Sequence, residues 1–95
     1  MSIHRTNYFI AKPGQGPSLA RAFAPIIALI LDADGCIDCQ LLISNDNPDL
    51  VLVLEEWNSI EAHQGAAKIV RPDDFSKVMG FLAEKPSGNY FSRVI

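Results

Sequence analysis

The sequence predicts an α+β domain whose elements follow the order β-α-β-β-α-β. Four segments carry the alternation and the β-branched or aromatic residues that are typical of strands. Two other segments, one after the first strand and one before the last, repeat apolar residues at helical spacing. The 95 residues suit a single domain spanning 1–95. This element order is the ferredoxin-like, split-βαβ arrangement, which places the strands in one antiparallel sheet.

The first strand and the first helix come at the N-terminal end. Residues 3–12 alternate, and the turn-forming residues 13–16 end the strand. Pro17 suits the first turn of a helix. Apolar residues recur at helical spacing up to the stop signal Asp34-Gly35, namely Leu19, Ala22, Phe23, Ile26, Ile27, Ile30 and Leu31. Because Pro25 lies inside this segment, we expect it to bend the helix or divide it.

A hairpin and a two-piece helix follow. Residues 36–44 and 50–57 are predicted as strands, with turn-forming residues between them. Ser59 offers an N-cap for a short helix that runs to about Lys68. A second piece begins at Pro72 and repeats apolar residues at helical spacing, namely Phe75, Val78, Met79 and Leu82. After the breaker sequence Pro86-Ser87-Gly88, residues 89–95 are predicted as the last strand.

Both faces of the predicted sheet are apolar in the middle. Leu50, Leu52 and Leu54 point to one face, and Val51 and Val53 point to the other. The two helical segments cover only one face, and an uncovered apolar face exceeds what soluble monomers usually expose. We therefore expect a homodimer, closed by two-fold symmetry through one sheet face.

Charge and hydropathy exclude some partners. The net charge is −3 and the eight basic residues are dispersed, whereas nucleic acids and anionic membranes are bound by clustered Lys and Arg. The apolar stretch at residues 23–31 is too short for a membrane span, which needs about 20 residues. The N-terminus lacks the continuous apolar segment of a signal peptide. The sequence thus predicts a cytoplasmic protein that binds neither nucleic acid nor membrane.

Cys36 and Cys39 form a Cys-x-x-Cys sequence. On a regular strand, residues three apart point to opposite faces, so the two thiols are not expected to share a metal or a disulfide. No second Cys or His pair completes a zinc set. The sequence therefore predicts no metal site, and its glycine spacings predict no nucleotide site.

The densest group of functional side chains lies at the end of the third strand. Glu55 and Trp57, the only tryptophan, are followed by the helix cap and by His63. The pattern Glu-x-Trp-x-Ser-x-Glu-Ala over residues 55–62 resembles the antibiotic biosynthesis monooxygenase family of the dimeric α/β-barrel superfamily. Pro13-Gly14 and Asp34-Gly35-Cys36 are also similar to that family, so the resemblance covers nearly the whole chain.

The resemblance implies a homodimer of ferredoxin-like subunits, each with a small cavity between sheet and helices. Enzymes of the family oxygenate phenolic or quinol-like substrates without metal or flavin, because the deprotonated substrate itself gives an electron to oxygen. Relatives with the same fold degrade haem, isomerise small sugar phosphates or have no assigned activity. The expected function is cofactor-independent oxygenation of a small aromatic substrate. The alternatives are a haem- or small-ligand-binding protein and a non-catalytic dimeric module.

Two residues are the candidate catalytic groups. His63 is predicted on the inner face or the edge of its helix, where a neutral imidazole can take a proton from a phenol; a half-exposed structural histidine is the alternative. Many relatives carry a histidine nine residues after the tryptophan, where this chain has Ala66. Asn7 interrupts a strand, where asparagine is disfavoured, and the resemblance implies that it orients substrate or oxygen; an edge residue is the alternative.

Four more residues are candidates for substrate binding. Trp57 suits stacking on a planar substrate, or a structural plug between sheet and helix. Glu55 shares its face of the strand and suits either a substrate contact or a structural ion pair. Tyr8 and Arg93, together with Tyr90, are polar candidates that strand parity alone does not place.

Overall fold

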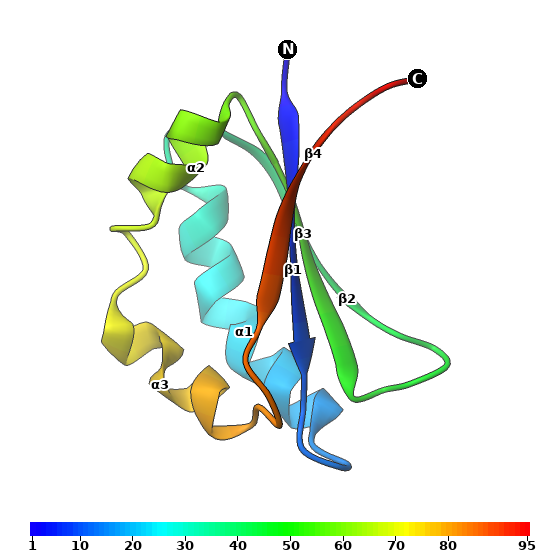
Figure 1. Cartoon of the computed structure of the whole chain (residues 1–95). Helices are drawn as coiled ribbons and strands as arrows, with labels where there is room; N and C mark the ends of the chain where they lie inside the picture. The colour runs from blue at the N-terminus through cyan, green and yellow to red at the C-terminus, as the bar shows by residue number, and fades with distance from the viewer.

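The computed structural model describes all residues, 1–95, and contains one four-stranded sheet with three helices on one of its faces (Figure 1). The strands are β1 (Ile3–Ile10), β2 (Cys36–Ile43), β3 (Leu50–Trp57) and β4 (Ser87–Ser92); the helices are α1 (Gly16–Leu31), α2 (Ile60–Ala66) and α3 (Pro72–Gly80). The strand order is β2-β3-β1-β4, and every neighbouring pair is antiparallel. The predicted ferredoxin-like α+β fold is therefore confirmed.

Some element ends differ from the predicted ones. The first strand stops at Ile10, and its neighbour Ala11 forms an isolated bridge with Leu82. The last strand starts at Ser87 and ends at Ser92, because it pairs with β1 only as far as Ile3. A strand needs a partner along its whole length, so residues 93–95 leave the sheet.

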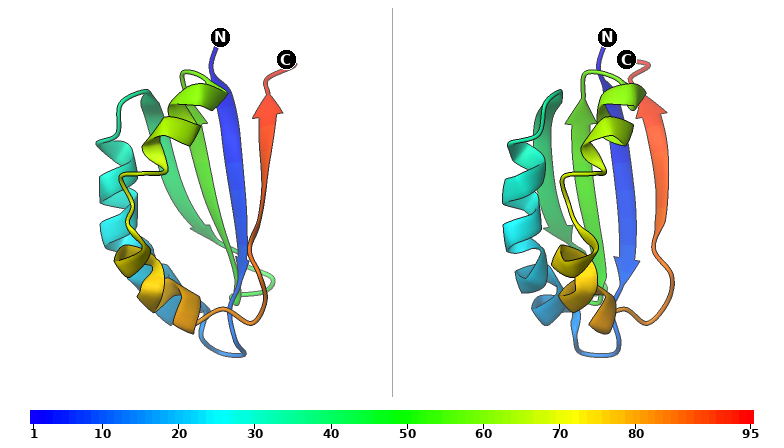
Figure 2. Two further views of the ribbon diagram at one scale, coloured as in Figure 1. Left: turned by 60° about the vertical axis from the view of Figure 1, so that its left-hand side comes forward. Right: turned by 90° about the vertical axis from the view of Figure 1, so that its left-hand side faces the viewer.

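Helix α1 continues through Pro25 as one element and curves along its length (Figure 2). Pro25 lies on the exposed side of the helix, so water can reach the carbonyl of Arg21 that loses its intrahelical partner. The other side of the helix buries Leu19, Phe23 and Ile26. Of the two predicted outcomes, a bent helix is therefore the correct one.

Helix α2 starts as predicted and is shorter than predicted. The Ser59 hydroxyl accepts a hydrogen bond from the Ala62 N–H at 3.0 Å, and Glu61 lies in the first turn. This cap satisfies a backbone donor that has no partner within the helix. The helix ends at Ala66, after which residues 67–71 lead to α3. Together α2, this connection and α3 lie beside α1 over the same sheet face (Figure 2).

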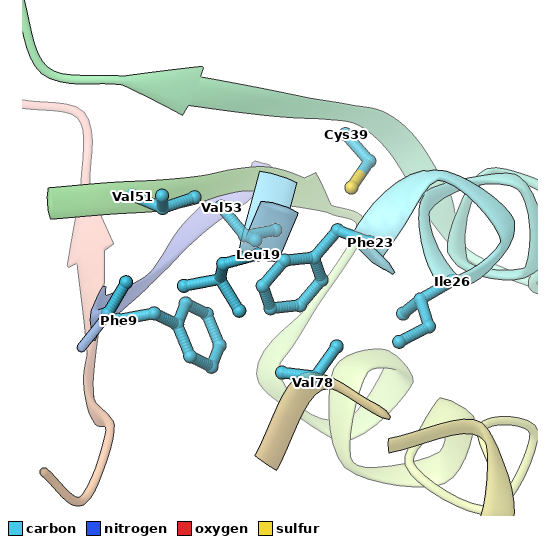
Figure 3. Close-up of a cluster of buried hydrophobic side chains, with 9 residues drawn as sticks. Phe9, Leu19, Phe23, Ile26, Cys39, Val51, Val53 and Val78 are labelled. Atoms are coloured by element: carbon cyan, nitrogen blue, oxygen red, sulfur yellow. The ribbon is translucent and has the colours of Figure 1, made fainter. Parts of the chain in front are cut away.

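The core lies between α1 and the sheet (Figure 3). In β3 every second residue is buried, namely Val51, Val53, Glu55 and Trp57. Val51 and Val53 pack with residues from β1, β2, α1 and α3, namely Phe9, Leu19, Phe23, Ile26, Cys39 and Val78. The strict alternation follows from the period of two along a strand, and it fixes which side chains reach the functional site.

A bulge corrects the prediction for the two cysteines. The β2–β3 register shifts between Cys36 and Asp38, so Cys36 pairs with Trp57 and Cys39 pairs with Glu55. Trp57 and Glu55 both face the helices, and the extra residue of the bulge therefore brings both thiols to that same face. Both cysteines are free, and burial is the main cause that raises the pKa of Cys39 to about 12. A thiol with so high a pKa is a poor nucleophile.

The other sheet face is bare in a single chain (Figure 1). Cross-strand pairing places three side chains next to one another in a row across this face, those of Leu42, Leu52 and Tyr8. We call this row the apolar rung. Tyr8 and Leu42 are exposed, and so is Phe91 of β4. Thr6 lies on the same face, and its buried hydroxyl has no hydrogen-bond partner. No helix of the chain is long and apolar enough to cross a bilayer.

Candidate active site

A cavity of about 350 Å³ lies between the sheet and the α2–α3 segment. Ligand-binding cavities start at about 300 Å³. One wall is apolar and comes from α1, α3 and the connection before α3, with Ile30, Ile69, Val70 and Phe75. The sheet supplies a polar wall with Arg5, Asn7, Glu55 and Ser87, and α2 adds His63. A cavity with one apolar wall and a few converging polar groups suits a small amphiphilic molecule.

Strand alternation brings the sheet residues together. Arg5, Asn7 and Phe9 occupy the helix-facing positions of β1, and Glu55 and Trp57 occupy those of β3. Arg5 pairs with Glu55 across the two strands, and Tyr90 of β4 pairs with Arg5 on its other side. Three neighbouring strands thus place their polar side chains in one row.

Glu55 is the centre of the hydrogen bonding. Its side chain is buried, with 3% exposure for the residue. The indole Nε1 of Trp57 donates to Oε1 at 2.7 Å, and the amide Nδ2 of Asn7 donates to Oε2 at 3.3 Å. Burial raises the pKa of the Glu55 carboxyl, while the bond from Trp57, the charge of Arg5 and the bond from Asn7 lower it. Burial is the dominant effect because the charged form loses its hydration.

His63 reaches this network from α2. Its Nδ1 lies 2.7 Å from the hydroxyl of Tyr90, and its Nε2 lies 3.8 Å from Oε1 of Glu55. The imidazole meets the rings of Trp57 and Tyr90 edge to face, at centroid distances of 5.5 Å and 5.4 Å. Burial lowers the pKa of His63, and the nearby charge of Arg5 lowers it further. A neutral imidazole near pH 7 is a competent proton acceptor.

Four of the predicted site residues therefore lie together: His63, Asn7, Trp57 and Glu55. The sequence alone did not show which face of its strand Tyr90 occupies. In the structure its hydroxyl contacts Nδ1 of His63, so Tyr90 lies beside these four residues. The helix position at which many relatives carry histidine, Ala66, also lines the cavity.

Tyr8 and Arg93 lie elsewhere, which corrects their grouping with Trp57. Tyr8 occupies an outward position of β1, next to two residues that face the cavity. Arg93 follows the end of β4, where its Nε donates to the carbonyl of Ile95 at 2.8 Å. The period of two in β1 and the early end of β4 are the physical reasons.

Arg5 and Gly88 also line the cavity and are not among the predicted site residues. Arg5 lies on the cavity side because it is two residues before Asn7, so strand alternation already contained this signal. Gly88 lies opposite Asn7 in the β1–β4 register. A Cβ there would overlap Nη2 of Arg5 and stand 2.6 Å from Oδ1 of Asn7. No local pattern distinguishes this glycine from a turn residue, because its neighbour across the sheet decides its role.

Comparison with known proteins identifies the family. The family model for antibiotic biosynthesis monooxygenase matches residues 2–68, more than half of the chain. The chain belongs to the antibiotic biosynthesis monooxygenase family. The matched range includes β1, α1, the β2–β3 hairpin and α2, and hence the segments that carry Arg5, Glu55 and His63. No curated protein sequence matches the chain.

Solved structures of similar proteins have the same fold as this monooxygenase family member. A candidate antibiotic biosynthesis monooxygenase from Nitrosomonas europaea has a TM-score of 0.86 at 14% identity, covering 98% of this chain and 90% of that one. One from Bordetella bronchiseptica has a TM-score of 0.82 at 19% identity, covering 99% and 98%. A mutant of SnoaB, a cofactor-independent oxygenase from Streptomyces nogalater, has a TM-score of 0.80 at 15% identity, covering 99% and 94%.

Proposed function

We propose that this member of the family is a cofactor-independent monooxygenase of a small phenolic or quinol-like aromatic substrate. The observation that carries the proposal is the position of His63. Its half-buried imidazole lines a cavity with an apolar wall, and burial lowers its pKa. A monooxygenase whose substrate supplies the electrons needs two things from the protein: a base that forms the substrate anion, and a site that excludes water.

The proton acceptor is Nε2 of His63. When the Nδ1–H donates to the hydroxyl oxygen of Tyr90, 2.7 Å away, Nε2 carries the free lone pair. The 3.8 Å between Nε2 and the Glu55 carboxylate oxygen is longer than a hydrogen bond. A substrate hydroxyl can therefore reach Nε2 from the cavity, transfer its proton and leave an electron-rich anion. Tyr90 holds the imidazole in the orientation that this transfer needs.

The remaining groups position the substrate. The Trp57 indole is fixed by its hydrogen bond to Glu55, and its edge-to-face contact with His63 sets the position of the imidazole. Asn7 is held by Arg5 on one side and Glu55 on the other. Rigid placement of substrate and base is the main source of rate enhancement when the protein adds no electrons of its own.

We also propose that two chains pair through the bare sheet face. The apolar rung of Leu42, Leu52 and Tyr8 supports this pairing. The hydroxyl of Thr6 supports it as well, because a buried donor without a partner is costly and a second chain can supply the acceptor.

The haem-binding alternative has less support. The cavity holds a single histidine, His63, and the carboxylate of Glu55 lies 3.8 Å from its Nε2. The family model that the chain matches is that of a monooxygenase.

The decisive experiment is oxygen consumption with a panel of hydroquinones and anthrones, in the presence of a metal chelator. We expect turnover by the unmodified protein and a loss of about a hundredfold in His63→Ala, the scale of a missing general base. Gln64→Ala, an exposed neighbour on α2, is the matched control and should retain full activity. Unchanged rates in His63→Ala, Asn7→Ala and Trp57→Phe would leave the proposed oxygenase without a site.

A further inference from the structure

Arg5 carries a positive charge into the cavity from the middle of the sheet. Its strand β1 has β3 on one side and β4 on the other. The guanidinium lies over the ring of Tyr90, with Cζ 4.6 Å from the ring centroid, and its Nε donates to Oδ1 of Asn7 at 3.3 Å. These two contacts hold the side chain in one orientation, so little conformational entropy is lost when it binds a ligand.

The guanidinium has no carboxylate partner. The contact between a basic nitrogen and a carboxylate at this end of the sheet joins Nε2 of His63 to Glu55, and Arg5 takes no part in it. Glu55 is the cross-strand neighbour of Arg5, but its two oxygens accept hydrogen bonds from Trp57 and Asn7. The Nε–Asn7 bond is the only side-chain hydrogen bond of Arg5. Both Nη nitrogens therefore keep their donors for a ligand in the cavity that Arg5 lines.

Gly88 makes room for this arrangement. A Cβ at residue 88 would overlap Nη2 of Arg5. The φ angle of Gly88 is not among the positive values of the chain, so backbone conformation does not require glycine here. The requirement is space, because the guanidinium lies against the β4 backbone.

The two Nη groups form a planar fork that matches the two oxygens of a carboxylate. Arg5 is the only permanent cation in the cavity lining, and Glu55 is an acid in the same lining. One opposed cation suits a monoanion better than a phosphate dianion. The opposite wall is apolar, with Ile30, Val70 and Phe75, and suits the aromatic body of such a molecule.

We propose that Arg5 binds a carboxylate of the substrate, so that the substrate class of this site is a small aromatic acid. The proposal rests on the proposed function, because it assigns the aromatic substrate of that same cavity. Arg5 then determines specificity, while His63 acts on the hydroxyl of the same molecule. When a neutral analogue binds, the two Nη groups of Arg5 remain without an acceptor in a half-buried site. The affinity for the analogue is therefore lower than that for the acid.

The test compares the binding of 2-naphthoate and 2-naphthamide by isothermal titration calorimetry. The two molecules have nearly the same shape and differ in charge. We expect the unmodified protein to bind the acid about tenfold or more tightly than the amide, the usual scale for a charge-assisted contact. In Arg5→Gln this preference should disappear while the affinity for the amide stays the same. Arg21→Gln removes the same charge from the exposed side of α1 and should keep the preference.

Gly88→Ala gives a second, independent variant. It retains Arg5 and displaces the guanidinium, so its preference for the acid should fall as well. Circular dichroism verifies that each variant is folded. An equal affinity of the unmodified protein for acid and amide overturns the proposal. So does an undiminished preference in either folded variant, or a 2-naphthyl phosphate affinity tenfold above that of the acid.

Neither naphthalene ligand carries an oxidisable hydroxyl, so the binding result is separate from the oxygenase activity. If the acid preference is absent while neutral hydroquinones consume oxygen, the substrate class is wrong and the proposed function stands. If the preference is present and neither the neutral hydroquinones and anthrones nor a hydroquinone that carries a carboxylate, 2,5-dihydroxybenzoate, consumes oxygen, the anion site stands and the oxygenase is wrong.

Discussion

The indole Nε1 of Trp57 donates a hydrogen bond to the Glu55 carboxylate, 2.7 Å away and two residues earlier on the same strand. Both side chains are almost fully buried, at 1% and 3% exposure. The pair is possible because residues two apart on a strand share a face. The bond joins the core to the acid of the cavity, so both residues are part of the core packing and also line the cavity.

We expect the Trp57–Glu55 bond to contribute measurable stability. Trp57→Phe removes the indole donor and leaves a buried carboxylate oxygen with one partner fewer, at a cost of about 1–3 kcal/mol beyond lost packing. A double-mutant cycle with Glu55→Leu, which removes both acceptor oxygens, measured by urea unfolding at pH 7, isolates that contribution from the packing effect. The cycle should give a coupling energy of at least about 1 kcal/mol. A value near zero would mean that the indole contributes by packing alone.

We expect the imidazole of His63 to titrate below 6.5, the ordinary value, because burial and the Arg5 charge disfavour its protonated form. The His63 ring signals in an NMR pH titration measure this midpoint directly. Arg5→Gln removes the second cause, so the midpoint should move upward, toward the ordinary value. Arg21→Gln is the charge-matched control and should leave it in place. A His63 midpoint above 6.5 in the unmodified protein would contradict the role of burial.

Burial of Glu55 predicts an effect of pH on stability. Its folded-state pKa is raised above 4.5, the ordinary value, so between 4.5 and the folded pKa the folded state binds more protons than the unfolded state. The stabilisation is fully present below pH 4.5 and is lost as the pH rises through the folded pKa.

Glu55→Gln removes this titration. The free energy of unfolding of the variant, relative to the unmodified protein, should therefore increase as the pH rises from 4.5. Urea unfolding at several pH values measures the difference. His63 contributes the opposite slope, since its lowered pKa makes stability fall as the pH decreases below 6.5. Because its Nε2 lies 3.8 Å from Glu55, both proteins are compared in a His63→Gln background, which removes that slope. A difference that is constant with pH would refute the raised pKa of Glu55.

The dimer proposal predicts that Leu52→Lys produces a monomer. Leu52 lies in the middle of the apolar rung on the bare face. A lysine at this position is solvated in a single chain, but in a dimer its charge is buried without a partner, which destabilises the dimer. Light scattering on a size-exclusion column measures the mass at micromolar concentration. Leu29→Lys makes the same change on α1, at an exposed position away from the bare face, and should remain dimeric. A monomeric unmodified protein would refute the dimer.

The fold is largely determined by local signals in the sequence. The alternation of β3 from Leu50 to Trp57, the Ser59 cap and the Pro72 start are each set by neighbours in the chain, and the structure contains all three at the predicted positions. The antiparallel hairpin follows from the turn between two such strands. No local signal predicts the bulge at Ile37. This bulge places Cys36 on the same face as Cys39, whereas a regular strand would place the two on opposite faces. It depends on how β2 registers against β3, and a one-residue shift changes the face of every side chain before it.

By itself the sequence determined the element order, the family resemblance, and a cluster of Glu55, Trp57 and His63 within one continuous stretch. Only the tertiary structure brought Arg5, Tyr90 and Gly88 to that cluster, because they come from strands distant in the chain and meet through sheet register. Tyr8 faces away from the cavity because its neighbours on β1, Asn7 and Phe9, face it. Local periodicity tells which residues share a face, and strand pairing alone decides which faces meet.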